Sequence, residues 1–344
     1  MSRLLTTVTA ITVIASTYVN ADVPKVVADI APIHSLVSRV MDGIGEPKLI
    51  VPNETSPNDY RLRPADAQAI EDANLVFWMG EGLTPWMERA LEALNSDTDV
   101  VEFLALEESV RLAFREGALF EAHDDHDDHD KDHDDHDKDH DDHDDHDDHD
   151  DHDKDHDDHD DHDDHDDHAG HDHGEFDPHA WLSTSNAKTW LNVIAAKLSS
   201  VDPSNAGTYF ANASQARNEL DALDAEINAM LGPVRGGKFI VFHDAYQYFE
   251  AVYDIPASGA ISLGDASDPS AARIAEIANR IKTENIDCVL SEPQFNARLV
   301  KTVMGATDAK TQVIDPIVFG IESGSSLYPK LIRSMAQSLV DCLK

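Results

Sequence analysis

Cysteine is scarce in this sequence, which has only two among 344 residues, Cys288 and Cys342. The chain can therefore form at most one disulfide. In an oxidising compartment we expect the pair to be bonded, closing a loop of about 55 residues and contributing roughly 4 kcal/mol through the unfolded state. Two buried free thiols are the alternative.

Basic residues are also few, with 26 Lys and Arg against 68 Asp and Glu and a net charge of −42. No basic stripe is present, which excludes nucleic acid as the expected partner and favours a cation. Long apolar runs are missing too, because beyond the N-terminus nothing approaches the roughly 18 apolar residues of a membrane span. Residues 1–21 have the pattern of a signal peptide, with Arg3, an apolar stretch and "VNA" before Asp22. An uncleaved anchor is the alternative to a soluble, exported protein.

Histidine is abundant in one place and rare elsewhere, since 17 of the 20 lie between His123 and His173. The same stretch holds 29 Asp and 3 Lys and no core-forming residue, so we expect 121–174 to be a disordered loop when metal-free. A solvated charge run without a specific role is one interpretation. Imidazoles spaced between carboxylates favour another, many weak metal sites that weaken as the pH falls. Only His34, His179 and His243 remain outside the stretch.

The rest of the chain alternates apolar runs with helical periodicity, which predicts an α/β fold with parallel sheets. In the first half we expect strands at 25–31, 47–52, 75–80 and 99–106, with helices at 33–41, 63–74 and 84–94. After a helix ending near 199, residues 202–231 form the longest helical pattern, which we expect to join two lobes, with Asp202 as its cap. The second half repeats this alternation of strands and helices, with strands beginning at 238, 287 and 310 and a helix at 271–285. The predicted lobes are 22–201 and 232–344.

Polar side chains gather where these predicted strands end, the edge at which open α/β sheets bind ligands. They come from both halves of the chain and comprise His34, Asn58, Asp59, His179, His243, Glu292 and Asp315. Imidazole and carboxylate on separate rigid elements suit Zn²⁺, which prefers four tetrahedral ligands. The sequence therefore predicts a zinc site.

The order of motifs around these residues resembles the zinc-specific solute-binding proteins of bacterial ABC transporters. The motifs are "SPNDYRLRPAD", a histidine-rich loop, "DPHAWLS", "FHDAYQYF", "SEPQF" and "DP", and they cover essentially the whole mature chain. The resemblance implies two parallel-sheet α/β lobes joined by a single long rigid helix, with a metal cleft between the lobes. It also implies a C-terminal disulfide between Cys288 and Cys342.

Carried over residue by residue, the resemblance makes His179 and His243 zinc ligands and Asp315 a carboxylate that completes the site in some members. In the manganese-preferring branch of the family a carboxylate commonly takes the second position, so His243 favours zinc. Glu292 is expected to be a supporting group rather than a ligand. His34 is expected to be a packed histidine, although it stays a candidate.

The chain departs from the family pattern at Asn58, where "S-x-H-x-Y" has a histidine and this sequence reads "SPNDY". Three alternatives stay open. Asn58 binds weakly or through water, Asp59 replaces it, or His34 or a loop histidine completes the shell. We expect a lower zinc affinity than the family pattern would give.

The resemblance implies a monomeric periplasmic protein that captures Zn²⁺ and passes it to an ABC permease, without enzymatic activity. A rigid interlobe helix would limit closure, so release would involve local loop motion. The alternative is a periplasmic zinc buffer or chaperone whose histidine-rich loop is the main binding element. A metallohydrolase is disfavoured, because no H-E-x-x-H stretch or comparable catalytic signature occurs.

Overall fold

The computed structural model of the chain describes residues 23–53, 55–93, 98–115, 117, 120, 175–262, 270–294, 305, 309–317 and 319–344. The predicted signal peptide and the predicted loop at 121–174 lie outside these residues and stay predictions. Within the described ranges, no helix is long and apolar enough to cross a membrane.

The first half forms a parallel four-stranded sheet in the order β2–β1–β3–β4. Its strands are β1 (Val26–Ala28), β2 (Lys48–Leu49), β3 (Leu75–Trp78) and β4 (Asp99–Glu102). Every residue of β1 and β3 is buried, as expected for parallel strands that are covered on both faces. The helices between the strands each start with a proline in the first turn and are α1 (Ala31–Val40), α2 (Pro64–Glu71) and α3 (Pro85–Glu92).

The second half repeats this arrangement in a sheet of order β6–β5–β7–β8, again with parallel pairing. Its strands are β5 (Phe239–His243), β6 (Ala260–Ser262), β7 (Cys288–Ser291) and β8 (Lys310–Val313). The helices α6 (Gln247–Tyr253) and α7 (Ala271–Thr283) follow β5 and β6. Two parallel α/β sheets confirm the predicted fold class, and β5 lies inside its sheet, between β6 and β7.

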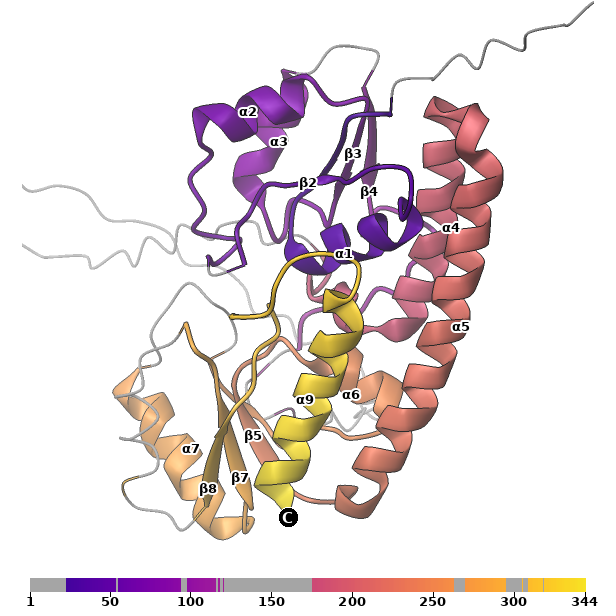
Figure 1. Cartoon of the computed structure of the whole chain (residues 1–344). Helices are drawn as coiled ribbons and strands as arrows, with labels where there is room; N and C mark the ends of the chain where they lie inside the picture. Colours follow the sequence, from indigo (N-terminus) through magenta and orange to yellow (C-terminus); the bar gives the residue numbers. More distant parts are fainter. Residues whose placement is uncertain are drawn as a thin grey trace, which may run out of the picture. The chain divides into compact units, whose positions relative to one another are not determined.

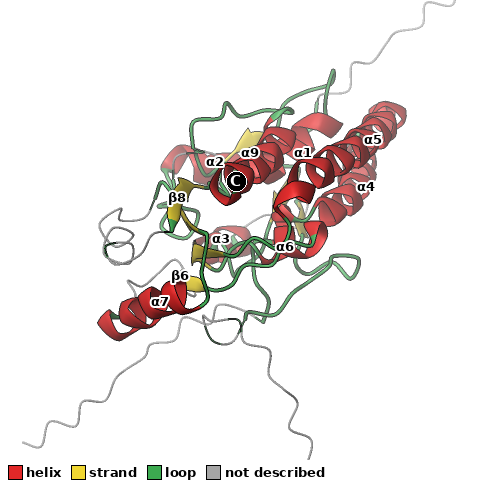
Figure 2. Cartoon of the chain, turned by 90° about the horizontal axis from the view of Figure 1, so that it is seen from below, coloured by secondary structure: helices red, strands yellow, loops and turns green. Residues whose placement is uncertain are grey.

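A long helix, α5 (Ala206–Leu231), connects the two halves and spans about 39 Å at 1.5 Å per residue. It runs beside α4 (Thr184–Val201), as Figures 1 and 2 show, and contacts α1 of the first half and α6 and α9 (Leu327–Leu343) of the second. Its buried residues recur every three or four positions: Tyr209, Ala213, Ala216, Leu220, Leu223, Ile227 and Leu231. This stripe packs into a single apolar core that draws side chains from both sheets.

Three details differ from the sequence-based expectation. The helix does not start at Asp202, because a short 3-10 turn (η2, Pro203–Asn205) precedes α5. Asp202 makes no backbone cap there; its carboxylate accepts hydrogen bonds from the side chains of Asn205 and Tyr209. The sequence-based expectation also leaves out β6 and α9.

The disulfide between Cys288 and Cys342 is present, as predicted, and joins the start of β7 to the last turn of α9. Both residues are buried, and their Cα atoms are 5.7 Å apart. The bond therefore attaches the C-terminal helix to an inner strand of the second sheet.

Candidate metal centre

The ring of His243 is fixed by a carboxylate from the neighbouring strand. His243 ends β5, and Glu292 follows β7, which is parallel to β5, so both side chains emerge at the same sheet edge. Glu292 Oε1 lies 2.5 Å from His243 Nδ1, and Glu292 Oε2 accepts a hydrogen bond from Gln294 at 2.8 Å. This contact orients the ring, with Nδ1 facing the carboxylate and Nε2 on the opposite side.

The ring of His179 is fixed in the same way by its own local sequence. In "DPH", Asp177 Oδ1 accepts from the backbone N–H of His179 at 2.9 Å and lies 2.6 Å from its Nδ1. The other oxygen of Asp177 accepts from Gln247 at 2.6 Å, and the residue is fully buried. The short turn that begins after His179 (η1, Ala180–Leu182) leads into α4, so the imidazole stands on a rigid element with Nδ1 facing Asp177 and Nε2 on the opposite side.

The two imidazoles meet through their Nε2 atoms. The Nε2 atoms of His179 and His243 are 3.5 Å apart, and the residues are 8% and 1% exposed. Two Zn–N bonds of about 2.05 Å at a tetrahedral angle place the nitrogens about 3.3 Å apart. The arrangement is therefore spaced for one shared metal ion.

Asp315 lies on the segment that follows β8, and this segment contacts a neighbour of His179. Its carboxylate accepts from the backbone N–H groups of Ile317, at 3.0 Å, and Phe319. The carbonyl oxygen of Pro316 accepts from Trp181 Nε1 at 3.0 Å, and the Trp181 ring is centred 5.2 Å from the His179 ring. The backbone that follows Asp315 is thus held by Trp181, whose ring lies near that of His179.

Asn58 lies on a turn whose ends are anchored. Val51 N–H donates to Asp29 O beside β1, and Trp86 Nε1 donates to Pro57 O at 2.8 Å. Asn58 is half-buried, whereas the neighbouring Asp59 is exposed. Among the described residues, no three His, Cys, Asp or Glu side chains form a group that could hold a metal ion. The structure thus brings together His179 and His243 as a pair, and Asn58 and Asp315 stay predicted ligands.

His34 has a structural environment of its own within α1. Its Nε2 lies 3.0 Å from Pro47 O, and its Nδ1 lies 3.4 Å from Ser38 Oγ. Burial lowers the pKa of His34, which keeps the ring neutral. These hydrogen bonds tie α1 to the residue before β2, in agreement with a packed histidine.

One charged cluster beside the pair is not predicted by the sequence. Arg115 donates to Asp244, the residue after His243, and to Glu250 of α6 at 2.8 Å. Burial alone would lower the pKa of Arg115, but the hydrogen bonds to the two carboxylates raise it above its usual range. Arg115 is therefore a permanent cation that pairs with two buried acids, one of them next to His243 in the sequence, and burial still raises the pKa of both carboxyls.

Comparison with known proteins agrees with this architecture. The profile of the family described as "ZnuA: Zinc-uptake complex component A periplasmic" matches residues 26–342. The high-affinity zinc uptake system protein ZnuA of Brucella abortus (strain 2308) is 45% identical over 318 residues, covering 92% of this chain and 91% of that protein. The protein of the same name from Paracoccus denitrificans (strain Pd 1222) is 42% identical over 325 residues, covering 94% and 93%.

Solved structures share the fold at lower identity. A structure titled "Crystal structure of ZnuA" is 20% identical, with a TM-score of 0.67 and coverage of 94% of this chain and 100% of that chain. A zinc-bound ZnuA deletion mutant has the same identity and TM-score, with coverage of 94% and 99%. The family profile spans nearly the whole chain and the identity to relatives reaches 45%, so this protein belongs to the family of the periplasmic zinc-uptake complex component A.

Proposed function

We propose that this protein captures Zn²⁺ in the periplasm and delivers it to an ABC permease in the membrane. Zinc is the cargo rather than a resident cofactor, and the protein acts as a monomer without catalysing a covalent reaction. The family assignment supports this function, as do the names of the relatives, which are high-affinity zinc uptake proteins.

One observation carries the proposal: two buried imidazoles face each other at 3.5 Å, each with a carboxylate on its Nδ1. A carboxylate behind a ligating histidine fixes its tautomer and raises its basicity, an arrangement typical of zinc sites. A packed or surface histidine needs neither a buried carboxylate on Nδ1 nor a second imidazole facing its Nε2. His179 and His243 are therefore the proposed ligands.

Asp315 and Asn58 are the proposed ligands from the flanking segments. The Asp315 carboxylate is oriented by the backbone N–H groups of Ile317 and Phe319, and a carboxylate oxygen is a suitable zinc ligand. Asn58 would supply an amide oxygen, a weaker zinc donor than the imidazole expected there, which supports a reduced affinity. Glu292 and Asp177 support the ligands rather than bind the ion.

The test is zinc competition against a chelator in His179→Ala and His243→Ala. Each should weaken the tight site by more than about 100-fold, since even loss of a supporting group costs 10- to 100-fold. His34→Gln is the matched control, because it removes a buried histidine that is hydrogen-bonded elsewhere, and it should keep the affinity. Unchanged binding in either alanine variant would reject the proposed site.

The placement of 17 of the 20 histidines within residues 123–173 favours a second candidate, a periplasmic zinc buffer. In that case the histidine-rich segment would supply the main binding capacity. Deleting residues 121–174 separates the two functions. Calorimetry that finds a single surviving tight site supports transport, whereas loss of all tight binding supports the buffer.

A further inference from the structure

We infer that Asn53 is a positioning residue that holds two segments together beside the zinc site and thereby sets how long the ion stays bound. The inference rests on the proposed function. It concerns the segment 52–60, which carries Asn58, and the segment 315–323, which carries Asp315. Asn53 itself is outside the expected ligand set.

The side chain of Asn53 bonds the second segment at two points. Its Nδ2 donates to Ile321 O at 2.6 Å, and its Oδ1 accepts from Ser323 Oγ at 2.9 Å. Asn53 and Ile321 are 268 positions apart in the sequence, so this contact is formed only by the folded chain. A donor and an acceptor on one planar amide fix both the distance and the orientation between the segments.

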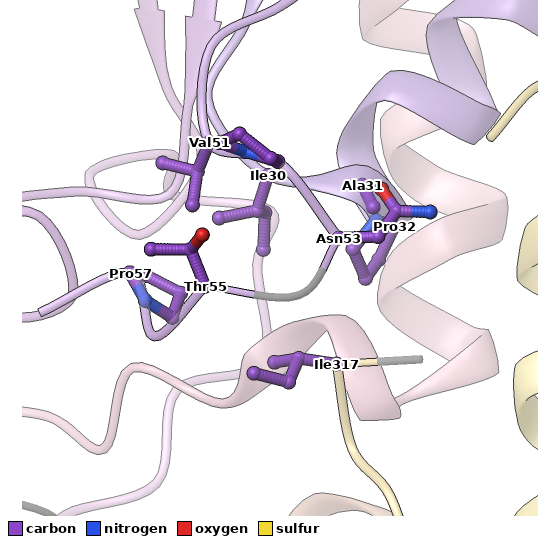
Figure 3. Close-up of a pocket in the computed structure, with 9 residues that line it drawn as sticks. Ile30, Ala31, Pro32, Val51, Asn53, Thr55, Pro57 and Ile317 are labelled. Atoms are coloured by element: carbon purple, nitrogen blue, oxygen red, sulfur yellow. The ribbon is translucent and has the colours of Figure 1, made fainter. Parts of the chain in front are cut away.

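A small hollow lies inside this joint. Its volume is about 10 Å³, and it is lined on one side by Ile30, Val51, Thr55 and Pro57 and on the other by Ile317. Figure 3 shows Ile317 lying across the hollow from Ile30 and Thr55, with Asn53 at its edge. Ile30 and Ile317 belong to one buried apolar cluster, so the hydrogen bonds of Asn53 add a fixed orientation to a contact that apolar packing also supports.

Both segments are anchored to the core on their other sides. Val51 and Pro57 are held by hydrogen bonds to Asp29 O and from Trp86, and Pro316 O is held by Trp181. Breaking the Asn53 contact therefore removes the directional bonds between the segments while leaving both sheets packed. The segments would then separate transiently more often, which would speed the release of an ion whose proposed ligands Asn58 and Asp315 lie on opposite segments without changing the ligands of the bound state.

Asn53→Ala removes both bonds and should raise the zinc dissociation rate about five- to tenfold, the effect expected for one or two neutral hydrogen bonds. The rate is measured by stopped flow with excess chelator on the full chain. Ser323→Ala should give a smaller increase, and it should add almost nothing in the Asn53→Ala background because the pair acts as one unit. Substituting Co²⁺ should give the wild-type absorption spectrum in all three variants, since the ligands are unchanged.

Asn212→Ala is the matched control. Like Asn53, Asn212 makes two side-chain hydrogen bonds to a distant segment; it donates to Val40 O and Asp42 O at 2.9 Å each and ties α5 to the end of α1. A wild-type dissociation rate in Asn53→Ala, or the same acceleration in Asn212→Ala, would overturn the inference. An altered Co²⁺ spectrum would also overturn it, because Asn53 would then be a ligand. Loss of the proposed function would instead show as unchanged zinc binding in the His179 and His243 variants.

Discussion

Glu292 offers the sharpest test of how the site is built, through the substitution Glu292→Gln. The carboxylate is buried, lies 2.5 Å from Nδ1 of His243 and is itself held by Gln294. The amide has nearly the same shape but no charge, and it has one acceptor oxygen instead of two. It can serve either His243 or Gln294 as acceptor, but not both.

The expected loss follows from this arrangement. Removing the carboxylate behind a metal-bound histidine typically costs 10- to 100-fold in affinity. Since the amide oxygen can still accept from Nδ1, we expect about tenfold, or about 1.4 kcal/mol, for Glu292→Gln. Glu292→Ala removes the acceptor altogether and should approach 100-fold. Gln294→Ala leaves the carboxylate on His243 and should cost less than either.

Chelator competition measures these affinities, and X-ray absorption at the zinc edge reports the ligands. The expected pattern is a graded loss of affinity with two histidine nitrogens still bound. If Glu292→Gln binds zinc as tightly as the wild type, the carboxylate does not increase the zinc affinity of His243. If its loss equals that of His243→Ala and an oxygen ligand disappears, Glu292 binds the ion itself.

The remaining predictions concern other parts of the molecule. Asn58→His should raise zinc affinity at least about tenfold, because imidazole nitrogen is the better zinc donor; equal affinity in chelator competition would exclude position 58 from the shell. Cys288→Ser should lower the free energy of unfolding by about 4 kcal/mol, given the 54-residue separation of the cysteines. Urea unfolding measures this loss, and a reductant should reproduce it in the wild type. Burial raises the pKa of Asp29 to about 7 from 3.8, so the folded state holds a proton that the unfolded chain loses. Stability of the metal-free protein should therefore fall as pH rises from about 4 to 7. Asp29→Asn should flatten that slope in urea unfolding; an unchanged slope would contradict the assignment.

The strands that carry the site could be predicted because they are short, fully apolar runs that end in polar residues. "FIVFH" and "CVLS" show this pattern, and parallel strands place their carboxyl ends at one edge. His179 and His243 could be singled out because so few histidines lie outside the repeat. The pairing of their Nε2 atoms follows from that edge and from the turn at "DPH".

Long-range partners could not be predicted. Arg115 lies in a stretch without periodicity, and its partners Asp244 and Glu250 are 129 and 135 positions away. From the composition alone, any of the many Asp and Glu residues could have been the partner of Arg115. β6 has only three residues, too few for a period to emerge. The helix α9, in contrast, could have been predicted, because its buried residues recur every three or four positions. Asn53 reads as an ordinary turn residue until the fold brings Ile321 to it.

The apolar stripe of α5 has a consequence for how the protein could tell one ion from another. Because one apolar core contains side chains from both sheets, a hinge-type opening of the two halves would expose that core to water. In the proposed site, metal selectivity then depends on the distance between the two imidazole rings, which is fixed before the ion binds. Metals that favour other bond lengths or angles would have to displace the two rings or bind with fewer ligands. Changing the metal preference would accordingly require moving the carboxylates that hold the rings by fractions of an ångström, and not redesigning a hinge.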